Sequence, residues 1–85
     1  MDTEGQSFSA LVKEMRRQLA LSQEDLARQL GVSYATVNRW ENSLSKPSKL
    51  AKAQLKAFCE KMIERGKLTL SADMIDFAEL GSDQD

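Results

Sequence analysis

The chain has 85 residues, of which 41% are hydrophobic and 29% charged, so it fits one small domain near the lower size at which a core suffices. A single cysteine excludes an intrachain disulfide and fits the reducing cytoplasm, and the lack of histidine removes the commonest general base and metal ligand. No signal peptide is visible, and no apolar run approaches the roughly 20 residues that span a bilayer.

Charge is unevenly distributed along the chain. The net charge is −1, but residues 1–67 carry 12 Lys and Arg against 8 Asp and Glu, whereas residues 68–85 carry 5 acidic residues and no basic one. Nucleic-acid affinity depends on the local patch that faces the phosphates, not on the total. The modestly basic body is therefore compatible with nucleic-acid binding that is weak for one copy, and one hypothesis is that the acidic tail lies back on it.

The first expected element is a helix that follows a disordered N-terminus. Residues 1–6 (MDTEGQ) are polar and show no periodicity, as frayed ends do. Ser7 can cap a helix that stops around Leu19-Ala20. Its apolar side chains recur at helical spacing, namely Phe8, Leu11, Val12, Met15 and Leu19. Scarce proline and the lack of β-branched runs favour helices throughout the chain.

Two short helices are predicted between Ser22 and Asn42. Ser22 is placed as an N-cap with Asp25 in capping-box spacing. Gly31 follows the helical face of Leu26, Ala27 and Leu30, at a position where a helix end needs a residue that tolerates positive φ. Ser33 then caps a second helix, on which Val37 and Trp40 face inward, so we expect Trp40 in the core and not stacked on bases. The outer face of this helix holds Tyr34, Ala35, Thr36, Asn38 and Arg39.

A turn over residues 42–47 leads to a longer helix. Pro47 cannot continue a helix but suits the start of one, with Ser48 or Ser45 as its cap. From Lys49 to Arg65 the apolar residues form one broad stripe, and Gly66 ends the helix. The stripe contains Leu50, Ala51, Leu55, Phe58, Cys59, Met62 and Ile63, among which Cys59 is expected to be a buried structural thiol.

The last segment is predicted to add a fifth helix. Ser71 is a fair N-cap, and the apolar positions at residues 74–80 predict a helix over 72–80, followed by a disordered tail at 82–85. We therefore expect one domain over residues 7–66 and a C-terminal helical extension over 67–81. This extension and the surplus length of the preceding helix are the expected contacts for a second copy or a protein partner.

The order of residues closely resembles the Cro/repressor (Xre-type) helix-turn-helix family, over roughly Leu11 to Leu55. The matching pattern is Leu21-Ser22-Gln23-x-x-Leu26-Ala27-x-x-Leu30-Gly31-Val32-Ser33, then Thr36-Val37-x-x-Trp40-Glu41-Asn42, then Lys46-Pro47-Ser48. The resemblance implies an all-α, compact, lambda-repressor-like bundle of five helices with the helix-turn-helix at helices 2 and 3. The expected core is Leu11, Met15, Leu19, Leu26, Ala27, Leu30, Val32, Val37, Trp40, Leu55 and Phe58.

The resemblance also implies an ion pair and two departures from the family pattern. Family members pair an arginine with the glutamate of the Trp-Glu-Asn segment, which implies Arg16–Glu41 here; the alternative is that Arg16 is a solvated surface charge. Ala20 and Ser43 stand where the family usually has glycine. A left-handed alanine at position 20 would cost on the order of 1 kcal/mol.

DNA contacts follow from the expected position of the second short helix in the major groove. Arg39 can bind guanine in bidentate fashion and Asn38 can bind adenine, whereas Ala35 and the Thr36 methyl can touch a thymine methyl. Tyr34 can stack on a sugar or donate to a phosphate. In the family the glutamine at Gln23 meets a phosphate at the start of its helix. The other expected phosphate contacts are Ser33, Ser43, Ser45, Lys46, Lys49 and, more weakly, Arg17.

These observations favour sequence-specific binding of double-stranded DNA by a transcriptional regulator that acts as a homodimer. The alternative is an antitoxin-like or partner-binding module, or the DNA-targeting domain of a DNA-modification system. An enzyme is the weakest interpretation, because no catalytic constellation, phosphate loop or metal-ligand cluster is visible in the sequence. We expect no cofactor and no membrane contact.

Overall fold

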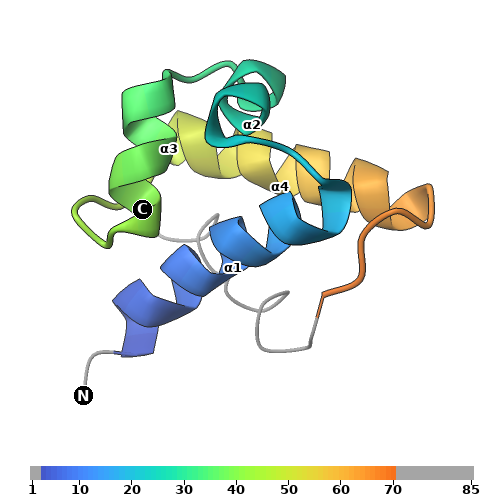
Figure 1. Cartoon of the computed structure of the whole chain (residues 1–85), viewed down its shortest axis with the longest axis horizontal. Helices are drawn as coiled ribbons and strands as arrows, with labels where there is room; N and C mark the ends of the chain where they lie inside the picture. The colour runs from blue at the N-terminus through green and yellow to red at the C-terminus, as the bar shows by residue number, and fades with distance from the viewer. Residues whose placement is uncertain (1–2, 71–85) are drawn as a thin grey trace.

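The computed structural model describes residues 3–70, which form four helices and no strand. Helix α1 spans Thr3–Leu19, α2 Gln23–Leu30, α3 Tyr34–Glu41 and α4 Lys49–Glu64. Helix α3 packs against both α1 and α2, and α2 also packs against α4 (Figure 1). No helix in this described range is long and apolar enough to cross a membrane. The expected all-helical architecture is confirmed.

The first helix begins earlier in the chain than predicted. Helix α1 begins at Thr3, so residues 3–6 are helical and Ser7 is not its cap. The prediction of a disordered start was wrong for these residues because they contain no proline, and one glycine lowers helix propensity without stopping a helix. Four helices are described instead of five. The fifth helix expected at 72–80 and the tail at 82–85 lie outside the described residues.

Three of the helices begin with a serine cap, as predicted. The side-chain oxygens of Ser22, Ser33 and Ser48 each accept a hydrogen bond from the backbone N–H three residues later. In α2 the Asp25 carboxylate also accepts from the Ser22 N–H, which completes the capping box. Ser48, not Ser45, caps α4. Each cap occupies one of the N–H groups that a helix start leaves without a partner.

All four helices end in the same backbone motif, in which one residue is left-handed. These residues are Gly31 and Gly66, both with φ of 74°, Ala20 with φ of 56° and Ser43 with φ of 58°. At each end the residue after the left-handed one donates its N–H to the carbonyl five residues earlier, as Leu44 does to Arg39 over 2.8 Å. The two positions where this sequence departs from the family pattern therefore adopt the conformation that favours glycine.

Glycine at these two left-handed positions is expected to stabilise the domain. An L-residue in this conformation costs roughly 1–2 kcal/mol, and the added freedom of glycine in the unfolded chain offsets about 0.4–1 kcal/mol of the gain. We expect Ala20→Gly and Ser43→Gly each to raise the free energy of unfolding by about 0.5–1 kcal/mol, additively, in urea titrations. Ala57→Gly, inside α4, is the control and should lower it by about 1 kcal/mol. A lower free energy of unfolding in Ala20→Gly would contradict the inference that the left-handed conformation strains Ala20.

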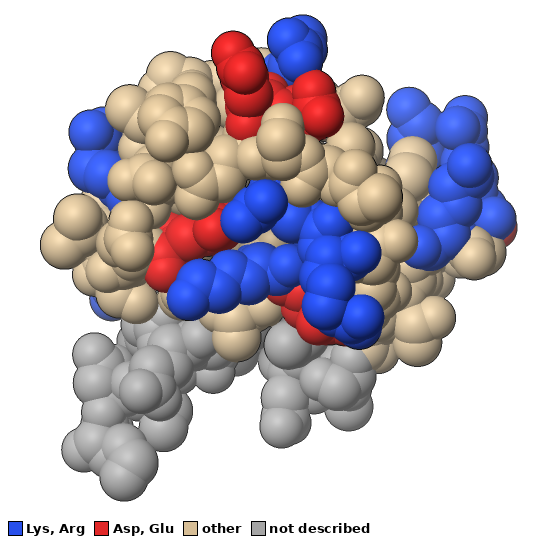
Figure 2. Space-filling view, viewed as in Figure 1, with Lys and Arg blue, Asp and Glu red and all other residues tan. Residues whose placement is uncertain are grey.

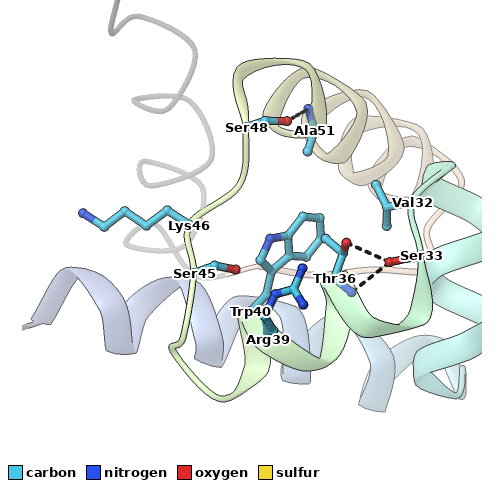
Figure 3. A pocket seen from close by; sticks show the side chains of 9 residues that line it. All are labelled: Val32, Ser33, Thr36, Arg39, Trp40, Ser45, Lys46, Ser48 and Ala51. Carbon is cyan, nitrogen blue, oxygen red and sulfur yellow. Dashed lines mark hydrogen bonds between the residues drawn. The ribbon is translucent and has the colours of Figure 1, made fainter.

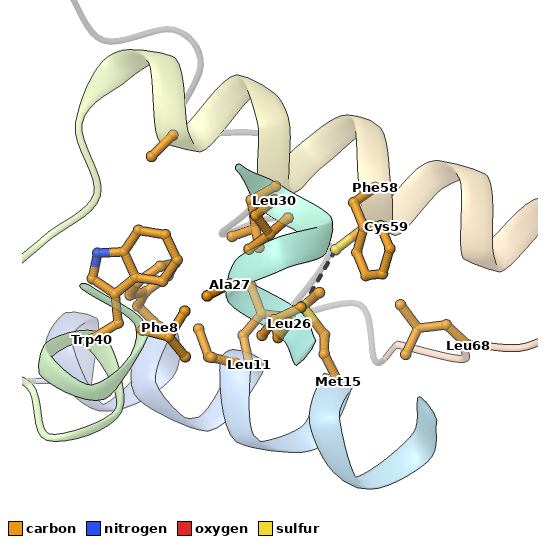
Figure 4. Close-up of a cluster of buried hydrophobic side chains, with 14 of the residues drawn as sticks. Phe8, Leu11, Met15, Leu26, Ala27, Leu30, Trp40, Phe58, Cys59 and Leu68 are labelled. Atoms are coloured by element: carbon orange, nitrogen blue, oxygen red, sulfur yellow. Dashed lines mark hydrogen bonds between the residues drawn. The ribbon is translucent and has the colours of Figure 1, made fainter. Parts of the chain in front are cut away.

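The hydrophobic core lies between the four helices and includes Trp40, whose exposed fraction is 1%. The Phe8 and Trp40 rings meet edge to face with centroids 5.5 Å apart, which joins α1 to α3 (Figure 4). All predicted core residues are buried except Leu19 and Val32, which are partly buried and pack against the core. The Cys59 thiol lies 3.6 Å from the Met15 sulfur, and burial raises its pKa to about 11, as expected of a structural thiol.

The apolar stripe of α4 is narrower than predicted. Ala51, Leu55, Phe58 and Cys59 are buried, whereas Leu50 is 70% exposed. Ile63 is also exposed. The reason is helical phase, because Leu50 lies about 100° around the helix from the buried Ala51.

A short non-helical segment after α4, residues 68–70, covers one part of the core and is called the strap below. Leu68 and Leu70 are buried, and the Gln18 side chain holds Thr69 between them. The Thr69 N–H donates to Gln18 Oε1 over 2.8 Å, and Gln18 Nε2 donates to the Thr69 carbonyl over 2.8 Å. The core thus continues past residue 66, the predicted domain end. The Gln18 amide makes this possible because it supplies hydrogen-bond partners for the backbone N–H and carbonyl of Thr69, as a neighbouring β-strand would.

Candidate nucleic-acid interface

A shallow open groove of about 430 Å³ lies between α3, the turn after it and the start of α4 (Figure 3). Its floor contains Val32, Trp40 and Ala51. The rest of the lining is polar or cationic and includes five of the predicted DNA contacts, namely Ser33, Thr36, Arg39, Ser45 and Lys46, together with the cap Ser48. Residues that are up to 19 positions apart in the sequence, from Val32 to Ala51, therefore line one surface.

The outer face of α3 divides into exposed and tethered side chains. Tyr34 is 54% exposed, and Ala35 and Arg39 are also exposed. The Thr36 hydroxyl instead lies 2.9 Å from the Ser33 hydroxyl, which also caps α3 (Figure 3). Asn38 is half-buried and hydrogen-bonded within the protein. Of the five predicted base contacts, Tyr34, Ala35 and Arg39 are the most accessible.

Basic residues outnumber acidic ones in the stretch of chain that forms the groove and most of α4. Between Gly31 and Cys59 the chain has five basic residues and one acidic residue, Glu41, which is buried. The basic residues are Arg39, Lys46, Lys49, Lys52 and Lys56. The Arg39 side chain has no hydrogen-bond or ion-pair partner among residues 3–70. The region around the turn can therefore present a positive surface to phosphates.

Three arginines outside the groove, Arg16, Arg17 and Arg28, are paired with carboxylates. Figure 2, drawn from the side on which α1 lies in front, shows Lys and Arg beside Asp and Glu. Arg17, a predicted phosphate contact, bonds Glu14 at 2.9 and 2.5 Å, and Arg28 bonds Asp25 at 2.7 Å. The hydrogen bond from Arg17 is the main cause that lowers the pKa of Glu14 to about 2. Arg17 would have to leave this carboxylate to reach DNA.

The ion pair between Arg16 and Glu41 is confirmed and locks α1 to the end of α3. Arg16 Nε and Nη2 donate to the two Glu41 carboxylate oxygens over 2.6 and 2.9 Å, and Nη1 donates to the Leu21 carbonyl. The Ser9 hydroxyl also donates to the Glu41 carbonyl over 2.6 Å. Burial acts to raise the pKa of Glu41, but hydrogen bonds from Arg16 and Gln23 and the Arg16 charge outweigh it, so this pKa lies below its ordinary value.

A chain of side-chain amides runs from this ion pair to the surface of α3. Gln23 Nε2 donates to Glu41 over 2.9 Å, and Asn38 Nδ2 donates to Gln23 Oε1 over 3.2 Å. Asn42 Nδ2 then donates to Asn38 Oδ1 over 3.2 Å. Gln23 and Asn38 were predicted to contact DNA, and these bonds between them were missed. The available signal was spacing, since Asn38 and Glu41 lie three apart on α3 and share a face.

The remaining predicted phosphate contacts lie along the turn and the start of α4. Ser43 is exposed and left-handed, Ser45 is half-buried, and Lys46 is exposed. Lys49 is exposed at the first position of α4. These residues flank the groove opposite α2, where Gln23 stands.

Comparison with known proteins agrees with this arrangement. A family model described as helix-turn-helix matches residues 12–51, which contain α2 and α3 completely. The type II methyltransferase M1.ScrFI of Lactococcus lactis subsp. cremoris is 35% identical over 81 residues. That match covers 91% of this chain and 21% of the methyltransferase, so the chain spans about a fifth of the length of that relative. No solved structure matches. Residues 12–51 are therefore similar to the helix-turn-helix family, in agreement with the resemblance to the Cro/repressor (Xre-type) pattern.

Proposed function

We propose that this chain binds double-stranded DNA sequence-specifically, with α3 in the major groove and the turn after it on the backbone. The observation that carries the proposal is the shared groove, in which exposed Arg39 of α3 lies beside Ser45 and Lys46 of the turn. Base reading and phosphate binding need such neighbouring surfaces, because phosphate contacts fix the register in which base edges are read.

Individual contacts follow from the chemistry of the exposed side chains. Arg39 offers a guanidinium fork to the O6 and N7 of guanine, and Ala35 offers a methyl to thymine. Tyr34 is placed to contact a sugar or phosphate. Phosphates are bound from the turn after α3 and from the start of α4, by Ser43, Ser45, Lys46 and Lys49.

Replacing Arg39 by alanine is expected to weaken binding to the preferred duplex by about 1–3 kcal/mol and to relax base preference at one position. The measurement is fluorescence anisotropy with the selected duplex and its single-base variants. Arg65→Ala, at the far end of α4, is the control of equal charge change and should leave the base preferences intact. Equal losses in both variants across all sequences would mean that Arg39 contributes charge without reading a base.

The chain acts in this proposal as a homodimer that regulates transcription. One helix-turn-helix reads only a few base pairs, so useful affinity comes from two copies on a two-fold operator. Leu50 supports this, because the start of α4 exposes this large apolar side chain to a second copy or another protein.

The proposal as a whole is tested by analytical ultracentrifugation, alone and with random 20-base-pair duplexes at two salt concentrations. A dimer whose duplex affinity falls steeply with salt is expected, since each neutralised phosphate releases counterions. A monomer without salt-dependent binding would overturn it.

A second candidate function is favoured by the similarity to a methyltransferase. In this alternative the domain directs a DNA-modification enzyme to its site and itself contributes binding without catalysis. Co-purification of a methyltransferase polypeptide with the tagged chain would support this function over a free-standing regulator.

A further inference from the structure

The buried carboxylate of Glu41 dictates how the neighbouring side-chain amides are oriented. An ionised carboxylate only accepts hydrogen bonds, so Gln23 must turn its NH₂ toward Glu41, as the 2.9 Å bond shows. Gln23 Oε1 then faces α3 and accepts from Asn38 Nδ2 at 3.2 Å. Asn38 Oδ1 in turn accepts from Asn42. Each hydrogen bond therefore fixes the orientation of the next side-chain amide.

This chain starts from a charge that is itself held in place. The Glu41 side chain is 5% exposed, and Arg16 contacts both of its oxygens. The Arg16 charge and hydrogen bonds keep the pKa of Glu41 below its ordinary value, so the carboxylate remains an acceptor across the neutral range. The orientation of the amides is therefore set by the fold before any ligand arrives.

From this geometry we infer that Gln23 and Glu41 are positioning residues that select which donor and acceptor Asn38 presents to a base. An amide has two N–H donors and two acceptor lone pairs. In Asn38 one of each is used by Gln23 and Asn42, which leaves one N–H and one lone pair in a fixed order. That order fits the N7 acceptor and N6 donor of adenine. The inference rests on the proposed DNA binding.

A double-mutant cycle on duplex affinity tests the coupling. Asn38→Ala is expected to weaken binding roughly 5- to 150-fold, the equivalent of one bidentate contact, and to abolish adenine preference at one position. Gln23→Met, which keeps the length of the side chain, should weaken binding and reduce preference at the same position. The double variant should bind within about twofold of Asn38→Ala alone, because Gln23 acts through Asn38. Gln29→Met, on the exposed side of α2, is the control.

Exchanging the residue types at positions 23 and 38 distinguishes a positioning role from a purely structural one. Only a positioning role predicts that the exchange recovers base preference. Gln23→Asn combined with Asn38→Gln preserves the total length of the two amides, and it should recover adenine preference that each single change loses. In the free protein, the Asn38 side-chain NH₂ resonances should move toward those of a solvated asparagine in Gln23→Met.

Two results would overturn the inference while leaving the proposed DNA binding intact. The first is multiplicative losses of affinity in the double variant, which would make Gln23 an independent phosphate contact. The second is an Asn38→Ala variant with unchanged base preference. Failure of the unchanged chain to bind duplex in a salt-dependent way would instead contradict the proposed function itself.

Discussion

Replacement of Arg16 by methionine is expected to lower the free energy of unfolding by about 3 kcal/mol at pH 7, at the lower end of the range for a broken buried pair. Methionine preserves the packing of the arginine stem but leaves the Glu41 carboxylate, 5% exposed, without its cation. Gln23 still donates to this carboxylate, which limits the loss. The measurement is urea unfolding followed by circular dichroism.

The pH dependence of that loss identifies its cause. In the unchanged chain the pKa of Glu41 is lowered, so its contribution to stability is present above the unfolded value, about 4.3, and is lost as pH falls. Without Arg16 burial dominates and raises this pKa, so the penalty of Arg16→Met should shrink as the pH is lowered from 7 to 5. Glu41→Gln should cost less than Arg16→Met, because Arg16 is 27% exposed and retains Leu21 as a partner. A penalty that is independent of pH would show that Glu41 is not responsible.

Truncation of Trp40 to alanine should be at least as damaging, with a loss of about 3–5 kcal/mol. The indole is 1% exposed and carries the edge-to-face contact with Phe8 that joins α3 to α1. In a domain of this size each kcal/mol corresponds to roughly 4–8 °C, so the Tm should fall by at least about 12 °C.

Tyr34 provides the matched comparison for Trp40. It lies on the same helix but is 54% exposed, so Tyr34→Ala should change stability by no more than about 0.5 kcal/mol while weakening DNA binding. A large loss of stability in Tyr34→Ala, or a small one in Trp40→Ala, would contradict the assignment of inner and outer faces on α3.

The helix-turn-helix was predictable because its signals are local. Ser22 and Ser33 cap helices through atoms three residues away, and Gly31 satisfies a backbone requirement at a single position. Val37 and Trp40 reveal the inner face of α3 by spacing alone. Such features depend on residues within one or two helical turns, and these residues are only a few positions away in the sequence.

The features that were missed depend on distant partners. Gln23 is a plausible phosphate contact until the fold places Glu41 and Asn38 beside its amide. Nothing near Thr69 in the sequence indicates that Gln18 will hold its backbone. The exposure of Leu50 follows from the helical phase of α4 relative to the buried Ala51, which hydrophobicity alone does not determine.

The two non-glycine helix ends bear on how this domain can evolve. Together Ala20 and Ser43 lower the free energy of unfolding by about 1–2 kcal/mol relative to glycine at the same positions. This loss is comparable to the destabilisation caused by one or two average substitutions. Neither residue belongs to the exposed face of α3 on which Tyr34, Ala35 and Arg39 lie. Glycine at these positions would therefore raise mutational tolerance without altering that face, so new base preferences that weaken folding could be explored from such a background.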